Sequence, residues 1–149
     1  MKKLLFQTDA DLTATVLRVV LALVILPHGL QKLVGAFNGY GFDATMNYFT
    51  ETVGLSWALG LLVILIESVG MILLLVGLFT RGIALLTIAI MIGAASMHWQ
   101  NGFFMNWFNN QPGEGVEFFL LAIGLAVHSV IRGAGKFSVD GLITRKSVV

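Results

Sequence analysis

Four long apolar segments dominate the chain and predict four membrane-spanning helices. They cover about residues 12–33, 57–78, 82–98 and 116–131. A helix rises about 1.5 Å per residue, so about 20 residues cross the roughly 30 Å of hydrocarbon in a bilayer. The first two segments are long enough, whereas the last two must borrow flanking residues or end under neighbouring helices. The pattern therefore predicts an all-α membrane protein built as an antiparallel bundle of four transmembrane helices.

The composition agrees with a protein that has lipid as its solvent. The chain has 149 residues, of which 57% are hydrophobic and 11% charged, whereas soluble domains carry about 25% charged residues. No repeat or linker divides it, so we expect a single domain over residues 1–149. There is no cysteine, which excludes disulfides, thiol redox chemistry and cysteine-ligated metals. A net charge of +1, without a basic patch interleaved with aromatic residues, gives no indication of nucleic-acid binding.

The basic residues are distributed unevenly along the chain, and this predicts its orientation. The two longer loops, at about residues 35–55 and 99–115, contain no lysine or arginine. Because cytoplasmic loops carry the excess of Lys and Arg, we expect both termini in the cytoplasm and the long loops outside. Seven of the nine basic residues would then lie on the inner side: Lys2, Lys3, Arg81, Arg132, Lys136, Arg145 and Lys146.

Both long loops are rich in aromatic residues. The first carries Phe37, Tyr40, Phe42, Tyr48 and Phe49, and the second carries Trp99, Phe103, Phe104, Trp107 and Phe108. Aromatic rings settle at the headgroup level of a membrane, so a plain aromatic belt explains them. The alternative is a lid over a lipophilic site.

Ionisable residues inside the apolar segments are the candidate functional residues. Each costs roughly 2.5–3.5 kcal/mol to insert, and therefore needs a partner or a water-filled cavity. Counting helical rise from the inner boundary places His28, His98 and Glu117 at about the same height, 22–24 Å. Glu67 lies at about 16 Å, near the midplane. We therefore expect these side chains to meet in a polar pocket near the outer face.

The first segment also carries a basic stripe. His28 and Lys32 are four residues apart and share a helix face, and Arg18 lies within about 80° of both. The acids Glu67 and Glu117 are the obvious complements. The candidate pocket residues are therefore His28, Lys32, Glu67, His98, Glu117 and Arg18.

Several of these residues also have simpler interpretations. Lys32 can snorkel to the outer headgroups and Arg18 to the inner ones, and His98 can be an ordinary interfacial residue. A carboxylate at the midplane cannot snorkel, so Glu67 must be protonated or paired with Arg18, His28 or Lys32. We favour a pairing.

The sequence contains no cofactor motif. His28, His98 and Glu117 are possible zinc or iron ligands, and two histidines can ligate haem, but no HExxH or comparable spacing supports a metal or haem. P-loop, GxGxxG and nucleophile-elbow motifs are absent. Histidine beside a carboxylate in a lipophilic pocket suits proton exchange with a quinone-like head group.

Four sequence blocks, in their order, resemble the DoxX family of small bacterial four-helix membrane proteins. The blocks are RVVLALVILPHGLQKL, ESVGMILLLVGLFTR, GEGVEFFLL and GAGKFSVD, and they run from about Arg18 to Asp140. The resemblance implies a multi-pass protein of the bacterial inner membrane, linked to redox and detoxification systems, with no established catalytic mechanism. The polar positions of the family fall on Arg18, His28, Gly29, Lys32, Glu67, Gly70, Arg81, His98, Glu117, Gly135, Ser138 and Asp140.

The last block, GAGKFSVD, follows the fourth apolar segment. Gly133 and Gly135 can end that helix, and Ser138 or Asp140 can cap a short return turn. We interpret the block as a cap beside the membrane. A cytoplasmic site for an anion or a partner, formed by Arg132 and Lys136, is the alternative.

The leading functional hypothesis is a membrane subunit of a redox or detoxification system that binds a quinone-like molecule in the pocket. Glu67 and Glu117 would accept protons. His28 and His98 would shuttle protons or donate hydrogen bonds to the head group, and Lys32 and Arg18 would be charge partners. Whether such a subunit is itself part of a quinone-linked oxidoreductase stays open. One alternative is a non-catalytic scaffold for soluble redox enzymes. Another is a small-molecule transporter, which with four spans would require a homo-oligomer.

Overall fold

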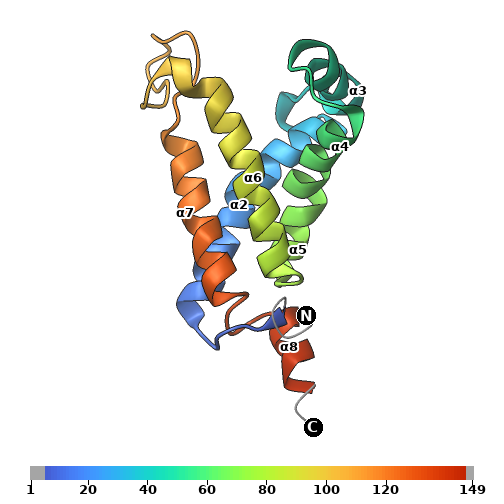
Figure 1. Cartoon of the computed structure of the whole chain (residues 1–149), viewed down its shortest axis with the longest axis vertical. Coiled ribbons are helices and arrows are strands. Elements are labelled where there is room, and N and C mark those ends of the chain that lie inside the picture. Colours follow the sequence, from blue (N-terminus) through green and yellow to red (C-terminus); the bar gives the residue numbers. More distant parts are fainter. Residues whose placement is uncertain (1–5, 147–149) are drawn as a thin grey trace.

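The computed structural model describes residues 6–146 and the side chains of residues 6–144; within this part of the chain every regular element is helical (Figure 1). Single turns of 3-10 helix, η1 (Ala36–Asn38) and η4 (Trp99–Asn101), and of π-helix, η2 (Tyr48–Thr52) and η3 (Ile66–Gly70), join longer helices. The expected all-α class is confirmed. The α-helices are α2 (Leu12–Val34), α3 (Gly41–Asn47), α4 (Trp57–Leu65), α5 (Met71–Val76), α6 (Thr80–His98), α7 (Glu117–Arg132) and α8 (Val139–Lys146).

The long helical runs alternate in direction along the chain (Figure 1). Helices α4, η3 and α5 form one continuous run that returns beside α2, and α7 packs along α6 and α2. A short turn joins α5 to α6, with Gly77 at φ 71° and Phe79 at φ 54°. Gly77 ends α5 in the left-handed conformation that glycine adopts without steric cost. The reversal is therefore tight, and α6 packs directly against α5 and η3.

Three helical segments are long and apolar enough to cross a membrane: Leu12–Val34, Trp57–Val76 and Thr80–Asn101. They correspond to the first three predicted spans. The fourth predicted span corresponds to α7, which has 16 residues and a length of about 24 Å. The prediction of membrane spans is thus confirmed for three segments, and α7 is shorter than a bilayer core is thick.

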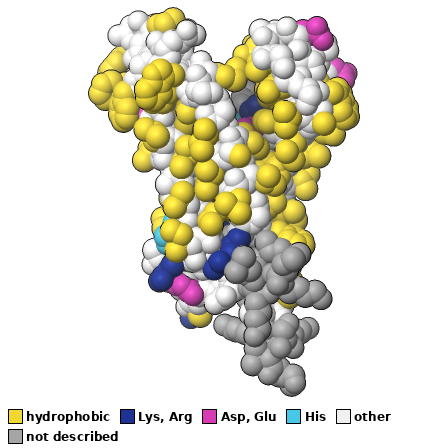
Figure 2. Space-filling model, in the orientation of Figure 1, with side chains coloured by type: hydrophobic (Ala, Val, Ile, Leu, Met, Phe, Trp, Pro, Cys, Tyr) yellow, Lys and Arg dark blue, Asp and Glu magenta, His cyan; other side chains and the backbone are white. Residues whose placement is uncertain are grey.

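The long helices expose apolar side chains on their outer faces. Only 22% of the most apolar window of Thr80–Asn101 is buried inside the protein. Large aliphatic side chains such as Leu23, Leu121 and Ile131 are 55%, 70% and 65% exposed, and Figure 2 shows hydrophobic side chains over most of the visible helical surface. Exposed apolar surface of this extent is stable in contact with lipid but not with water. The chain is therefore a membrane protein.

The GAGKFSVD block folds back onto the end of the molecule where the α5–α6 turn lies. Backbone N–H groups of Phe79 and Thr80 donate to the Asp140 carboxylate at 2.9 and 3.0 Å, and the Asp140 N–H donates to the Gly77 carbonyl oxygen at 2.9 Å. Ser138 accepts from the Gly141 N–H at 3.1 Å. The predicted cap is confirmed, but Asp140 caps the start of α6, a helix distant in sequence, where its negative charge complements the helix dipole.

The basic residues outside α2 whose side chains the structure describes lie at this same end. Arg81 begins α6, Arg132 ends α7, and Lys136 follows it. Loops 35–55 and 99–115 lie at the opposite end (Figure 1). Lys2, Lys3 and the side chains of Arg145 and Lys146, which also entered the predicted orientation, lie outside the described part.

Candidate functional site

Away from the termini the molecule divides into two arms (Figures 1 and 2). Helices α3, η2 and α4 form one arm with the end of α2, and the ends of α6 and α7 form the other with their connecting loop. A cavity of about 800 Å³, here the central cavity, lies between them, with a mainly aliphatic and aromatic wall. Its histidine, lysine and acidic side chains are His28, Lys32, Glu67, His98 and Glu114. A concave apolar wall with a few polar groups is typical of small-molecule sites.

An ion pair lies in the wall of this cavity. The Lys32 ammonium donates to the Glu67 carboxylate at 2.6 Å, and it also lies 3.4 Å from the His28 carbonyl oxygen. The side chain of Glu67 is 8% exposed and that of Lys32 is 27% exposed. Attraction between opposite charges is strong where water is largely excluded. The predicted pairing of Glu67 is thus confirmed, with Lys32 as the partner.

The backbone around Gly29 explains how the pair forms. A side chain at Gly29 would meet the backbone carbonyl of Glu67 and the N–H of Ser68, so α2 and η3 touch through their backbones. Lys32 lies almost one helical turn beyond this contact, and its side chain spans the remaining distance to Glu67. Glu67 belongs to the π-helical turn η3; such turns occur frequently at functional sites.

Two histidines line the cavity from different helices. His98 Nδ1 lies 2.9 Å from the Ala94 carbonyl oxygen, and because a carbonyl only accepts, Nδ1 carries the proton in this contact. The neutral ring then has Nε2 as an acceptor. The His98 ring lies 5.1 Å from that of Phe119, and the His28 ring lies 5.8 Å from that of Phe118. Aromatic side chains of α7 thus position both imidazoles.

Glu117 does not line the central cavity, although the sequence places it at the height of both histidines. Its carboxylate accepts hydrogen bonds from the Met105 N–H at 3.0 Å and from the Trp107 indole at 3.3 Å. The loop before α7 folds back over the helix start, so Glu117 holds the loop. Glu114 lies in the cavity wall instead, and its carboxylate accepts from the Asn106 N–H at 2.7 Å. Because Glu114 lies in a loop, helical periodicity in the sequence could not have indicated that it lines the cavity.

Arg18 also lies away from the cavity. It is 1% exposed and donates to the carbonyl oxygens of Ala134, Leu74, Leu75 and Phe137. Helical spacing places Arg18 within about 80° of His28 around α2, but ten residues separate the two, which is about 15 Å along the helix. Arg18 therefore joins α2 to the end of α5 and to the C-terminal block.

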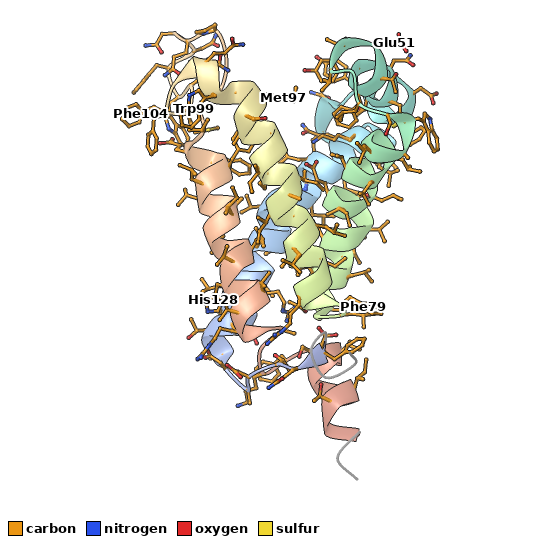
Figure 3. All side chains as sticks on the ribbon, in the orientation of Figure 1. Glu51, Phe79, Met97, Trp99, Phe104 and His128 are labelled. Carbon is orange, nitrogen blue, oxygen red and sulfur yellow. The ribbon has the colours of Figure 1, made fainter. Side chains whose placement is uncertain are left out.

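Some aromatic residues of the outer loops are placed as in an aromatic belt at the membrane interface, and others border the cavity as a lid would. Tyr48 and Phe49 line the central cavity. Trp99 and Phe104 are 73% and 67% exposed and project from the end of the second arm, whereas Met97 lies on the side of α6 toward the other arm (Figure 3). Most of the second loop is thus placed as a membrane-interface belt would be, and part of the first loop borders the cavity.

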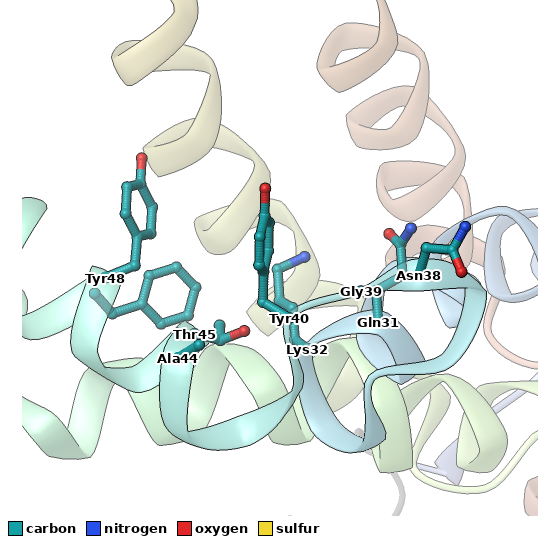
Figure 4. Close-up of a pocket in the computed structure, with 9 residues that line it drawn as sticks. Gln31, Lys32, Asn38, Gly39, Tyr40, Ala44, Thr45 and Tyr48 are labelled. Atoms are coloured by element: carbon teal, nitrogen blue, oxygen red, sulfur yellow. The ribbon is translucent and has the colours of Figure 1, made fainter.

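A second cavity of about 570 Å³ lies on the outer side of Lys32 (Figure 4). Its polar wall includes the amides of Gln31 and Asn38 and the phenol of Tyr40. It shares Lys32, Tyr48 and Phe49 with the central cavity. Lys32 therefore separates a more polar outer compartment from a mainly apolar inner one.

The described residues contain no group of three or more His, Cys, Asp or Glu side chains arranged to hold a metal ion. A histidine pair and an ion pair with apolar surroundings can instead donate and accept hydrogen bonds and exchange protons with a bound molecule.

Comparison with known proteins gives one match. The family model described as DoxX matches residues 13–100, which include α2 to α6 and the Lys32–Glu67 pair. No curated protein and no solved structure matches the chain.

Proposed function

The chain belongs to the DoxX family, and from this premise we propose that it is a membrane subunit of a redox or detoxification system that binds a quinone-like lipophilic molecule in the central cavity. The observation that carries the proposal is the Lys32–Glu67 ion pair, at 2.6 Å, in the wall of an otherwise apolar cavity. Ionisable groups are expensive at membrane depth, and a pair that borders an open cavity can act on a ligand.

The cavity fits such a ligand in size and in polarity. Its volume of about 800 Å³ falls in the range of roughly 300–1,000 Å³ that is typical of small-molecule sites. A quinone head group is flat and apolar and carries two carbonyl oxygens that only accept hydrogen bonds. The Lys32 ammonium and the imidazole of His28 are the donors that would hold those oxygens.

Groups of the same cavity would exchange protons with the head group while a redox enzyme outside this chain adds or removes its electrons. Glu67 is a carboxylate in a largely water-free environment, and the His98 Nε2 is an acceptor when Nδ1 bonds to Ala94. Each can take a proton from a hydroxyl group within hydrogen-bond reach. Lys32, which also borders the outer cavity, would connect this exchange with the outer side.

The orientation of the protein in the membrane is inferred from helix packing and from the positions of its basic residues. We infer that α7 is a fourth span, because it packs against α6 and α2, and because aromatic loop residues at its start extend its apolar surface. The end that carries Arg81, Arg132 and Lys136 is taken as cytoplasmic under the positive-inside rule. The central cavity then lies toward the outer leaflet of a bacterial inner membrane.

Exchanging the charges of the pair for neutral groups tests the proposal. We expect saturable binding of a decyl-substituted benzoquinone to the purified wild-type protein in nanodiscs. Lys32→Met should weaken binding about tenfold or more, because the head group loses a charged donor and Glu67 loses its partner. Glu67→Gln should weaken it less. Titration of intrinsic tryptophan fluorescence measures the dissociation constants.

Two controls separate binding from folding. Glu51→Gln removes an exposed acid on η2 that does not line the central cavity, and its affinity should equal that of the wild type. The double variant Lys32→Met with Glu67→Gln has no unpaired buried charge, so it should elute as a monodisperse peak and still bind weakly. Wild-type protein without saturable binding, or a double variant with full affinity, would overturn the proposal.

A further inference from the structure

One side of the central cavity is open, between α4 and α6. On α4, Leu59 and Leu62 line the cavity and are 51% and 37% exposed; on α6, Leu86 lines it and is 39% exposed. Helix α6 contacts η3 and α5, but beyond η3 the axes of α4 and α6 diverge (Figure 1). Residues that line a cavity and are also exposed mark its rim, so this rim faces sideways.

The space-filling view shows the opening directly. Between the two arms the surface is hollowed, and basic and acidic side-chain atoms are visible at its base (Figure 2). The view looks across the long axis of the molecule, along which α2, α4 and α6 run. The charged groups of the cavity can therefore be reached from the side of the helices.

Two other sides of the cavity are occupied by packed elements. The rings of His28 and Phe118 meet between α2 and α7, and α6 packs along α7. Behind the cavity, Gly29 brings α2 against η3. Tyr48 and Met105, from the two outer loops, contribute to its outer rim. The α4–α6 side is thus the side on which hydrocarbon-facing helices border the cavity.

The α6 side of the opening includes several small residues. Ala89, Gly93 and Ala94 line the cavity in succession with Ile90 and Met97. At Gly93 an added Cβ would meet nothing within 4 Å. Both bordering helices belong to segments that are long and apolar enough to cross a membrane, so the opening faces the hydrocarbon region. An apolar opening that leads from lipid to an ion pair suits a molecule with a polar head and a long apolar chain.

We infer that the ligand enters the central cavity sideways from the bilayer, and that its hydrocarbon or isoprenoid chain stays in the opening between α4 and α6 while its head group lies at Lys32 and Glu67. The lateral opening rests on the cavity geometry, and the identity of the head group rests on the proposed function. The occupant is therefore a molecule of the lipid phase.

Blocking the opening tests where the chain lies. Gly93→Trp places an indole at the opening, and its Cβ would meet no other atom within 4 Å. We expect it to weaken binding of a decyl-substituted benzoquinone about tenfold or more, since buried methylene groups contribute to affinity. Binding of the same head group without the decyl chain should change less than about twofold.

Gly82→Trp is the matched control. Gly82 lies on the same helix, an added Cβ there also meets nothing within 4 Å, and it does not line the cavity. The affinities for both ligands should be unchanged. Equal losses for both ligands in Gly93→Trp, or no loss for either, would overturn the inference.

A second measurement does not depend on the ligand. Because the chain has no cysteine, single-cysteine variants can be labelled with bimane, Ala94→Cys inside the cavity and Ile92→Cys on the lipid-exposed face of α6. In nanodiscs with chain-brominated phospholipids we expect quenching at both positions, and little quenching by aqueous iodide at either. Lipid quenching at position 94 without quinone binding would retain the lateral opening and refute the proposed function. Iodide quenching at 94 without lipid quenching would refute the opening, even if quinones bind.

Discussion

Gly29→Ala is expected to prevent α2 from packing on η3 and to lower stability by about 3 kcal/mol or more, because an added Cβ would overlap backbone atoms of Glu67 and Ser68 that cannot rotate away. Either the two helices separate, which removes Lys32 from Glu67, or the chain does not fold. The midpoint of thermal unfolding in detergent, followed by circular dichroism, measures the effect, and gel filtration reports the folded fraction.

The matched control for this prediction is Gly124→Ala. Gly124 lies within α7, and an added Cβ there would meet nothing within 4 Å. Since alanine is the better helix former, this change should leave stability unchanged or raise it by up to about 1 kcal/mol. If Gly29→Ala behaved like Gly124→Ala, the close backbone contact between α2 and η3 would not exist in the protein.

Arg18→Leu is expected to have an effect of similar size at the other end of the molecule. The guanidinium donates to Ala134 O at 2.9 Å, to Leu75 O at 2.6 Å, to Phe137 O at 2.8 Å and to Leu74 O. Each buried carbonyl left without a donor costs about 1–3 kcal/mol, so we expect a loss of at least about 3 kcal/mol. Arg18→Lys should recover only part of it, because an ammonium cannot reproduce the planar fork of donors. The same thermal unfolding measurement applies.

Arg132→Leu separates this effect from a general loss of positive charge. Arg132 forms ion pairs with Asp9 at 3.3 Å and with Asp11 at 3.9 Å, and its side chain is 50% exposed. Exposed pairs contribute about 0–1 kcal/mol, so its unfolding midpoint should stay close to that of the wild type. Arg18→Leu and Arg132→Leu with equal midpoints would contradict the role of Arg18 as a link between α2, α5 and the C-terminal block.

Arg18 and Asp140 show why the contacts that stabilise this protein are separate from those that would bind a ligand. Arg18 and Asp140 fasten the end that carries the basic residues, through hydrogen bonds to backbone groups of distant elements. The arms at the opposite end diverge around a cavity. A rigid base with an open end can admit a ligand without loss of the fold, since the elements that enclose the cavity are held together by contacts outside it.

The sequence by itself determined the helical class, the apolar segments that form the membrane spans, and the need of Glu67 for a partner. These follow from local quantities: hydropathy, helical rise, and the cost of a charge at a given depth. Helical spacing also placed His28 and Lys32 on one face, so that the pair with Glu67 was among the expected contacts. The capping role of the block that contains Asp140 was likewise readable from its glycines and polar residues.

Only the tertiary structure decided which ionisable groups line the central cavity. Arg18 lies about 15 Å from His28 along α2, and carbonyl oxygens of α5 and of the C-terminal block engage its guanidinium away from the cavity. Helical rise predicts that Glu117 lies at the height of both histidines, but the folded-back loop engages its carboxylate, and Glu114 lies in the cavity wall instead. The lateral opening is likewise set by the divergence of α4 and α6. The depth of a side chain and the direction in which it points follow from its position within one helix. Loop conformation and the angle between helices instead arise from packing between segments far apart in the chain.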